Sequence, residues 1–154
     1  MTCRMLGTLV LTVLAGATSA SASDTIARAT VGYANVFDAH AAFGASARVR
    51  IGRLFFAEPE LLWLRADGHS DVGPVFHVGI SGGTARAQVA LAAGLGPVQG
   101  LNDDDGLVCL SFGAALRVRE SGRLWIIPET RIGILGETGY FQAAIGVGYR
   151  LGSK

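Results

Sequence analysis

One eight-residue pattern occurs twice in this chain and constrains its fold more than any other feature. Residues 43–50 read F-G-A-S-A-R-V-R, and residues 112–119 read F-G-A-A-L-R-V-R. In both copies the side chains alternate with the two-residue period of a β-strand, so one face is apolar and the other carries arginine. An arginine face is costly in an ordinary apolar core, because an unpaired buried guanidinium is far less stable than one in water. A closed barrel with its apolar face toward lipid and its basic face inside removes that conflict.

The first residues of the chain have the features of a cleavable secretory signal. Arg4 precedes an apolar run over residues 5–17, and the A-S-A stretch at residues 20–22 has the small-x-small pattern of a cleavage site. The apolar run is shorter than the roughly 20 residues that a membrane-spanning helix needs. We therefore expect a signal peptide over residues 1–22 and one exported domain over residues 23–154.

Charge and cysteine content narrow the functional classes. Loss of Arg4 with the predicted signal reduces the 13 basic residues to 12, which equals the 12 acidic residues. The mature chain is then formally neutral, whereas a nucleic-acid partner would favour a strongly basic face, so no such partner is expected. Cys3 also leaves with the signal, so Cys109 is the one remaining cysteine and an intramolecular disulfide is excluded.

Eight segments of alternating polarity follow one another along the predicted mature chain. The expected strands are approximately residues 27–37, 42–52, 54–65, 75–81, 87–95, 107–119, 124–135 and 141–151. The facing of the first strand is ambiguous. The polar stretches at residues 66–74 and 96–106 are expected to be longer loops at one end, opposite shorter turns at the other. The sequence thus predicts an all-β fold, an eight-stranded antiparallel transmembrane β-barrel.

Ten charged residues on the polar faces of these strands are expected to form a charge network in the lumen. They are Arg48, Arg50, Glu58, Glu60, Arg86, Arg117, Arg119, Glu129, Arg131 and Arg150. An eight-stranded barrel is only wide enough for side chains to fill it, so a salt-bridged plug is the favoured interpretation. Seven arginines exceed three glutamates, which requires water or a bound anion to balance the excess. A narrow anion path or ligand site is the alternative.

Aromatic residues near the ends of the predicted strands are expected to form girdles at the two membrane interfaces. Toward the loops these are Phe37, Phe43, Trp63, Phe76, Tyr140 and Phe141, and toward the turns they are Phe55, Trp125 and Tyr149.

Together these features resemble the small outer-membrane β-barrel proteins of Gram-negative bacteria, a porin-like group that includes the OmpA-type membrane domain. The likeness covers the whole predicted mature chain and includes the final strand F-Q-A-A-I-G-V-G-Y-R-L at residues 141–151. The resemblance implies a location in the cell outer membrane, in contact with its lipid and lipopolysaccharide. Such barrels usually end in an aromatic residue, whereas Gly152-Ser153-Lys154 follow here. Recognition by the barrel-assembly machinery would then depend on Tyr149 and Leu151.

Three short motifs have residue types found in catalytic or metal sites. The segment His69-Ser70-Asp71 has the residues of a hydrolase, but adjacent loop residues do not converge as a triad requires. Neither it nor His77 with Ser81 reproduces the histidine-x-serine-asparagine pattern of lipid A deacylases, which some barrels of this size resemble. The run at residues 103–105, D-D-D, lacks the alternating oxygen ligands of a calcium loop, and His40 lacks partners for zinc. No catalytic residue, metal or cofactor is expected.

The sequence therefore favours a non-catalytic integral outer-membrane barrel, not an enzyme, with a structural, adhesive or envelope-integrity role through its exposed loops. One alternative is a lipid A- or phospholipid-modifying enzyme on the same scaffold, and another is a narrow anion-selective channel. A soluble exported barrel that binds an apolar ligand would reverse the facing, with arginines outside and aliphatic side chains inside. The oligomeric state and the specific partner are left open by the sequence.

Overall fold

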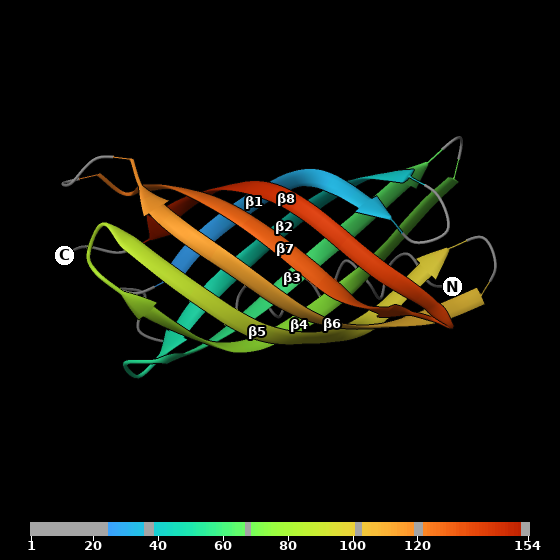
Figure 1. Ribbon diagram of the computed structural model, residues 1–154, viewed down its shortest axis with the longest axis horizontal. Helices are drawn as coiled ribbons and strands as arrows, with labels where there is room; N and C mark the ends of the chain where they lie inside the picture. The colour runs from blue at the N-terminus through green and yellow to red at the C-terminus, as the bar shows by residue number, and fades with distance from the viewer. Residues whose placement is uncertain (1–24, 36–38, 67–68, 101–102, 119–121, 152–154) are drawn as a thin grey trace.

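The chain folds into a closed antiparallel β-barrel (Figure 1). The computed structural model describes residues 25–35, 39–66, 69–100, 103–118 and 122–151. Their eight strands follow in chain order: β1 (Thr25–Asn35), β2 (Ala39–Ile51), β3 (Phe55–Ala66), β4 (His69–Gly83), β5 (Ala87–Gly100), β6 (Asp103–Arg117), β7 (Leu124–Leu135) and β8 (Thr138–Leu151). Each strand pairs with the next, and β8 pairs with β1, so no strand edge is exposed. The predicted all-β, eight-stranded architecture is confirmed.

The strands are long enough to cross a bilayer. They contain 11 to 15 residues, whereas a tilted transmembrane strand needs about 9–11. Among the described residues, no helix is long and apolar enough to span a membrane.

The described residues of the two polar stretches expected to be loops belong instead to paired strands. β3 ends at Ala66 and β4 begins at His69, while β5 ends at Gly100 and β6 begins at Asp103. Their residues pair across the sheet, as Leu62 does with Gly73. Glycine, proline and aspartate have low strand propensity, but ladder pairing with neighbouring strands overrides that local preference here.

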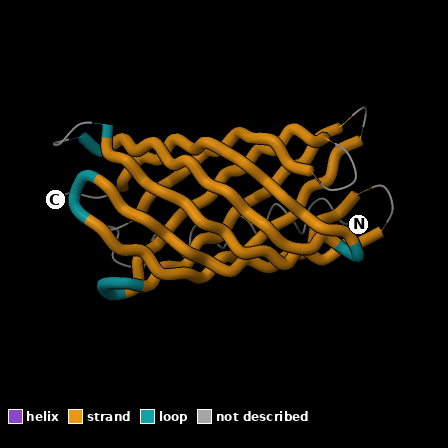
Figure 2. Tube along the Cα trace, in the orientation of Figure 1, coloured by secondary structure: helices purple, strands orange, loops and turns teal. Residues whose placement is uncertain are grey.

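Connection lengths also differ from expectation. We call the end of the barrel with the connections at residues 52–54, 84–86 and 118–123 the turn end, and the opposite end the loop end. Figure 2 shows the described parts of the connections as short segments between long strands. Only two residues separate β3 from β4, and two separate β5 from β6. The prediction of longer connections at the loop end is therefore wrong.

Glycine allows β4 and β5 to approach each other where both carry proline. The regular ladder is interrupted between the pairs Val72–Gln99 and Phe76–Leu95, the stretch that contains Pro74 and Pro97, because proline has no N–H to donate. A Cβ at Gly73 would overlap the carbonyl oxygen of Pro97, and one at Gly96 would overlap that of Pro74. Larger residues at these two glycine positions would push the strands apart.

The outer face of the barrel is apolar and the inner face carries the charges. Large apolar side chains point outward from every strand, and Val89, Leu91 and Leu95 of β5 are 51–65% exposed. The sequence left the facing of β1 ambiguous. In the structure Arg28 points into the lumen and Val31 points outward. This distribution is the reverse of that of a soluble barrel, which buries its aliphatic side chains and exposes its charges.

The aromatic residues only partly follow the girdle expectation. Phe43 and Trp63 are exposed on the outer face, with ring centroids 6.4 Å apart in an edge-to-face arrangement. Phe55, Phe141 and Tyr149 are also exposed on strand ends, as is Tyr33, which the prediction missed. The other predicted members differ: Phe76 is at the middle of β4, Trp125 and Tyr140 are buried in the lumen, and Phe37 lies outside the described residues.

Candidate functional site in the barrel lumen

Strand pairing brings charged side chains from β1, β2, β3, β4 and β7 into one layer of the lumen. Arg28 pairs with Ser46, Ser46 pairs with Glu60, and His77 pairs with Glu58. Because alternate residues of a strand face the same side, these positions all point inward, where Arg28, Glu58 and Glu60 are almost completely buried. We call this layer the charge network; its members are Arg28, Ser46, Arg48, Glu58, Glu60, His77, Glu129 and Arg131.

Arg28 joins two glutamates from different parts of the barrel wall. Its guanidinium nitrogens lie 2.7 Å from Glu58 Oε1 and 2.7 Å from Glu129 Oε2. Its Nε donates to Ser46 Oγ at 3.2 Å, and the Ser46 hydroxyl donates to Glu58 Oε1 at 2.7 Å. Arg48 reaches the other oxygen of Glu58 at 2.6 Å. One arginine of β1 thus crosslinks β3 and β7 through the lumen.

Arg131 makes the equivalent link on the other side of the network. Its two terminal nitrogens lie 2.7 and 3.1 Å from the oxygens of Glu60, with the hydrogen bond made by the second of them, and its Nε donates to Glu129 Oε1 at 2.5 Å. His77 Nε2 lies 2.8 Å from Glu60 Oε2 and donates to it, because a carboxylate only accepts. Glu129 is therefore shared by Arg28 and Arg131.

The charge network is electrically balanced within the described part of the lumen. Three arginines (Arg28, Arg48 and Arg131) face three glutamates. Buried ion pairs recover their desolvation cost only with good geometry and additional hydrogen bonds, both of which are present here. The network can hold the wall together, but its carboxylates and guanidinium groups are already engaged with one another.

The other residues predicted for the lumen lie outside the charge network. Arg50, Arg117 and Arg150 are half-buried at the turn end of the lumen, beyond the charge network. Arg86 is exposed in the connection before β5, so its assignment to the lumen is wrong. It precedes β5, which begins at Ala87 as expected, so the alternation of the strand does not extend to it. Arg119 lies outside the described residues.

An apolar layer fills the lumen between the charge network and the loop end. We call it the apolar cap; its members are Ala34, Ala42, Leu62, Leu64, Val75, Val98, Leu107, Cys109, Leu135 and Tyr140. Each is buried, and the Tyr140 hydroxyl donates to Gln142 Oε1 at its edge. Ions would have to cross both this layer and the paired charges behind it to pass through the barrel. The arrangement therefore opposes conduction.

Sequence reasoning missed four residues of the lumen that matter for this arrangement. Arg28 and Ser46 complete the ion pairs of Glu58, His77 contacts Glu60, and Tyr140 belongs to the apolar cap. A signal for Arg28 was available, since Ile26, Arg28 and Thr30 alternate with Ala27 and Ala29. Because alanine is compatible with either face, the two-residue period of β1 is not evident from the sequence.

Among the described side chains, the short motifs do not come together as a catalytic triad or a metal site. Ser70 and Asp71 are consecutive residues of β4, so their side chains point to opposite faces of the sheet. Ser81 shares the inner face with His77 but lies four positions away, about 13 Å along the strand. Among the described residues, no group of three or more potential metal ligands is close enough to hold an ion. The side chains of His69 and of residues 103–105 lie outside the described part of the structure.

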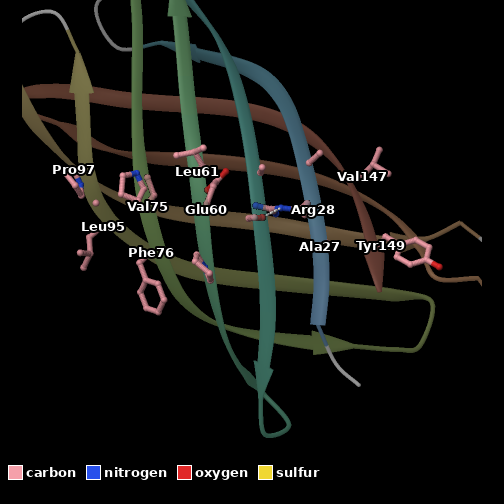
Figure 3. A pocket seen from close by; sticks show the side chains of 16 residues that line it. Ala27, Arg28, Glu60, Leu61, Val75, Phe76, Leu95, Pro97, Val147 and Tyr149 are labelled. Carbon is pink, nitrogen blue, oxygen red and sulfur yellow. Dashed lines mark hydrogen bonds between the residues drawn. The ribbon is translucent and has the colours of Figure 1, made fainter. Parts of the chain in front are cut away.

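The outer wall has a hollow of about 710 Å³ over β1–β5 and β8 (Figure 3). Its outward lining is small or apolar, with Ala27, Pro59, Leu61 and Phe76 among its residues. Arg28, Ser46 and Glu60 also border it, but their side chains belong to the charge network. The hollow therefore offers apolar contact and no reactive group.

No family model and no curated protein sequence matches this chain. Solved structures do match it. A de novo designed transmembrane β-barrel has a TM-score of 0.63 at 19% identity, over 82% of this chain and 94% of that one. The N-terminal β-barrel domain of Pseudomonas aeruginosa OprF has a TM-score of 0.65 at 12% identity, over 82% and 97%. Neisserial surface protein A has a TM-score of 0.63 at 12% identity, over 85% and 98%.

The chain has the fold of the small outer-membrane β-barrels. The resemblance inferred from its strand pattern and final strand is confirmed at the level of fold. At such low identities the likeness extends to the architecture alone, and the side chains of the lumen must be interpreted from their own contacts.

Proposed function

We propose that this protein is a non-catalytic integral protein of the outer membrane with a structural, envelope-integrity role. The observation that carries the proposal is the combination of an apolar outer wall with a lumen filled by the charge network and the apolar cap. An apolar wall is stable in hydrocarbon, and a filled lumen leaves the protein neither a water-filled path nor an open reaction site.

Export and insertion follow from the same proposal. Residues 1–22 serve as the signal peptide, and residues 23–154 form the membrane domain. Tyr149 and Leu151 are exposed on the outer face of β8 near the turn end. This position suits recognition of the last strand by the assembly machinery, and the wall above them then contacts lipid and lipopolysaccharide.

A structural role fits better than an adhesive one. The connections available for contact with a partner at the loop end are short, since β3–β4 and β5–β6 are each joined by only two residues. The surface that the loop end presents to a partner is correspondingly small. The rival enzyme function lacks converging catalytic residues among the described side chains, and the rival channel function conflicts with the apolar cap.

The two tryptophans provide a test of facing within one molecule. Trp63 is exposed on the outer wall and Trp125 is buried in the lumen. Refolded residues 23–154 are placed in bilayers of phosphatidylcholine with and without bromine on the acyl chains. We expect strong quenching of Trp63 emission in the Trp125→Phe variant and little quenching of Trp125 emission in the matched Trp63→Phe variant. Equal quenching, or none in either variant, would overturn the proposed location.

Conductance and lipid turnover test the proposed role directly. In planar bilayers the wild-type protein should give no discrete current steps, and incubation with phospholipid or lipid A should yield no cleaved or transferred acyl chain. Regular current steps would favour the channel, and a turnover that depends on His77 would favour the enzyme.

A further inference from the structure

The hollow on the outer wall runs across the strands instead of along one of them. Part of its lining is a row of residues that pair from strand to strand, from β8 through β1, β2 and β3 to β4. This row consists of Val147, Ala29, Ala45, Leu61 and Pro74. Figure 3 shows Tyr149 and Pro97 at opposite ends of the hollow. We call this oblique depression across β8 and β1–β5 the outer groove.

Small side chains make the outer groove lower than the wall around it. Ala27, Ala29 and Ala45 place only methyl groups on the outer face. Pro59 and Pro74 also project little, because their short rings are bound back to the backbone. The regular ladder is interrupted beside both prolines, between β2 and β3 and between β4 and β5.

Bulky side chains border the outer groove on the side of the loop end. Val31 pairs with Phe43, and Phe43 pairs with Trp63. These three side chains are 51, 42 and 48% exposed, so they stand above the neighbouring alanines. Atoms that line an unfilled depression lose dispersion contacts, which a group of matching shape restores. In hydrocarbon that group is either a lipid chain or the apolar wall of another protein.

The direction of the outer groove discriminates between these two occupants. Strands of a transmembrane barrel are tilted by about 35–45°, and cross-strand partners follow one another roughly perpendicular to the strands. The groove is therefore oblique to the membrane normal. A second copy inserted in the same direction would face this one across a two-fold axis along the normal, and that rotation makes its rows of side chains cross the groove. A rigid wall cannot follow the groove, whereas a flexible acyl chain can.

The end of the outer groove at Tyr149 has polar groups suited to a lipid headgroup. Tyr149 is exposed near the turn end, and its ring has an apolar body with a polar tip. Leu124 pairs with Tyr149, and the backbone N–H of Arg150 donates to the carbonyl oxygen of Arg123 at 2.9 Å. The exposed Arg123 thus lies next to this end, and a guanidinium suits a phosphate. At the other end, Pro97 and its described neighbours in the lining have no polar side chain.

We propose that the outer groove binds one acyl chain of a phospholipid, whose headgroup lies beside Tyr149. The chain crosses the alanines of β1 and β2 and continues toward Leu61 and Phe76. The inference rests on the proposed membrane location, because only that location places the groove in hydrocarbon. Association within lipid depends on packing and not on removal of apolar surface from water. The groove therefore retains a chain that fits it, while lipids on the rest of the wall exchange freely.

The alanine methyl groups are direct readouts of this site. Residues 23–154 with ¹³C-labelled alanine methyls are refolded in maltoside micelles, and phosphatidylglycerol with a nitroxide at mid-chain is added. We expect saturable broadening of the Ala27, Ala29 and Ala45 signals at probe ratios that leave Ala114, on the outer face of β6 near the turn end, sharp. Excess unlabelled phosphatidylglycerol should restore the three signals. Equal broadening of all four signals, or no restoration, would overturn the proposal.

A substitution that fills the outer groove separates a built site from general lipid contact. Ala45→Phe should weaken probe binding, read on Ala27 and Ala29, by about fivefold or more, because its ring takes the space of several chain atoms. Ala114→Phe is the matched control, since it adds the same ring to the wall outside the groove. Equal losses in both variants would show that the groove binds nothing in particular. The wild-type competition decides the matter even if Ala45→Phe fails to fold.

Two further measurements test the other occupants. Displacement of the probe by lipid A but not by unlabelled phosphatidylglycerol would assign the groove to a different lipid and overturn the proposal. Sedimentation in density-matched micelles should show a monomer. A dimer that is lost in Ala45→Phe and kept in Ala114→Phe would assign the groove to a second copy instead. Equal broadening at all outward alanines contradicts the site alone, whereas broadening at none of them contradicts the proposed membrane location as well.

Discussion

Two neighbouring layers of the lumen are filled by opposite kinds of chemistry. Toward the loop end, leucine, valine and alanine pack as in a soluble core, whereas the middle layer consists of arginine and glutamate in direct contact. Apolar contacts are tolerant of exchange, because many pairings of similar volume pack almost equally well. Ion pairs are not, because each group left unpaired retains its full desolvation cost. We therefore expect the charge network to fix the register of the strands more strictly than the apolar cap does.

The largest expected effect is on the charge network. Arg131→Met removes one ion-pair partner from Glu60 and one from Glu129, and it should lower the free energy of unfolding by about 3–5 kcal/mol. Urea unfolding of the refolded protein in phosphatidylcholine vesicles measures the change. A loss below about 1 kcal/mol would mean that water solvates the carboxylates that lose Arg131. The network would then constrain the strand register less than its contacts imply.

A smaller loss is expected in the apolar cap. Leu62→Ala removes a fully buried side chain and should cost about 3 kcal/mol through lost contacts and the remaining cavity. Leu95→Ala, on the outer wall at 65% exposure, is the matched control; lipid chains can fill the space, so the loss should be well under half as large. Equal losses at the two positions would show that the cap is not packed as a core.

The smallest effect tests a neutral member of the charge network. Ser46→Ala deletes the hydroxyl that accepts from Arg28 and donates to Glu58, while the ion pair between them remains. The same unfolding measurement should show a loss of about 1 kcal/mol, the usual contribution of a single hydrogen bond. A loss as large as that of Arg131→Met would indicate that Ser46 orients the whole network and is not merely an additional contact.

Sequence pattern predicted the strands and their facing well where side chains differ strongly in polarity. The side chains of β8 alternate between the two faces as the two-residue period indicates. The glutamates of β3, and Glu129 and Arg131 of β7, point inward as expected. The pattern failed where residues are small or are poor strand formers. The stretches at residues 66–74 and 96–106 read as loops, yet cross-strand pairing extends through them.

Aromatic residues were misplaced for a related reason. Trp125 and Tyr140 were assigned to the girdles by their position near strand ends, although their parity in β7 and β8 points inward. A position near a strand end is compatible with an interface and with a lumen mouth alike. Only burial distinguishes the two, and both residues are buried.

The amino-acid sequence by itself determined that this chain has eight alternating strands with an apolar and a charged face, because side-chain direction along a strand depends only on local geometry. The tertiary structure alone decided which charges meet. Arg28 and Glu129 are separated by 101 positions and lie on strands that are not neighbours in the sheet, yet their side chains are 2.7 Å apart. Such contacts across a lumen depend on the closure and stagger of the whole barrel, a global property that no local period encodes.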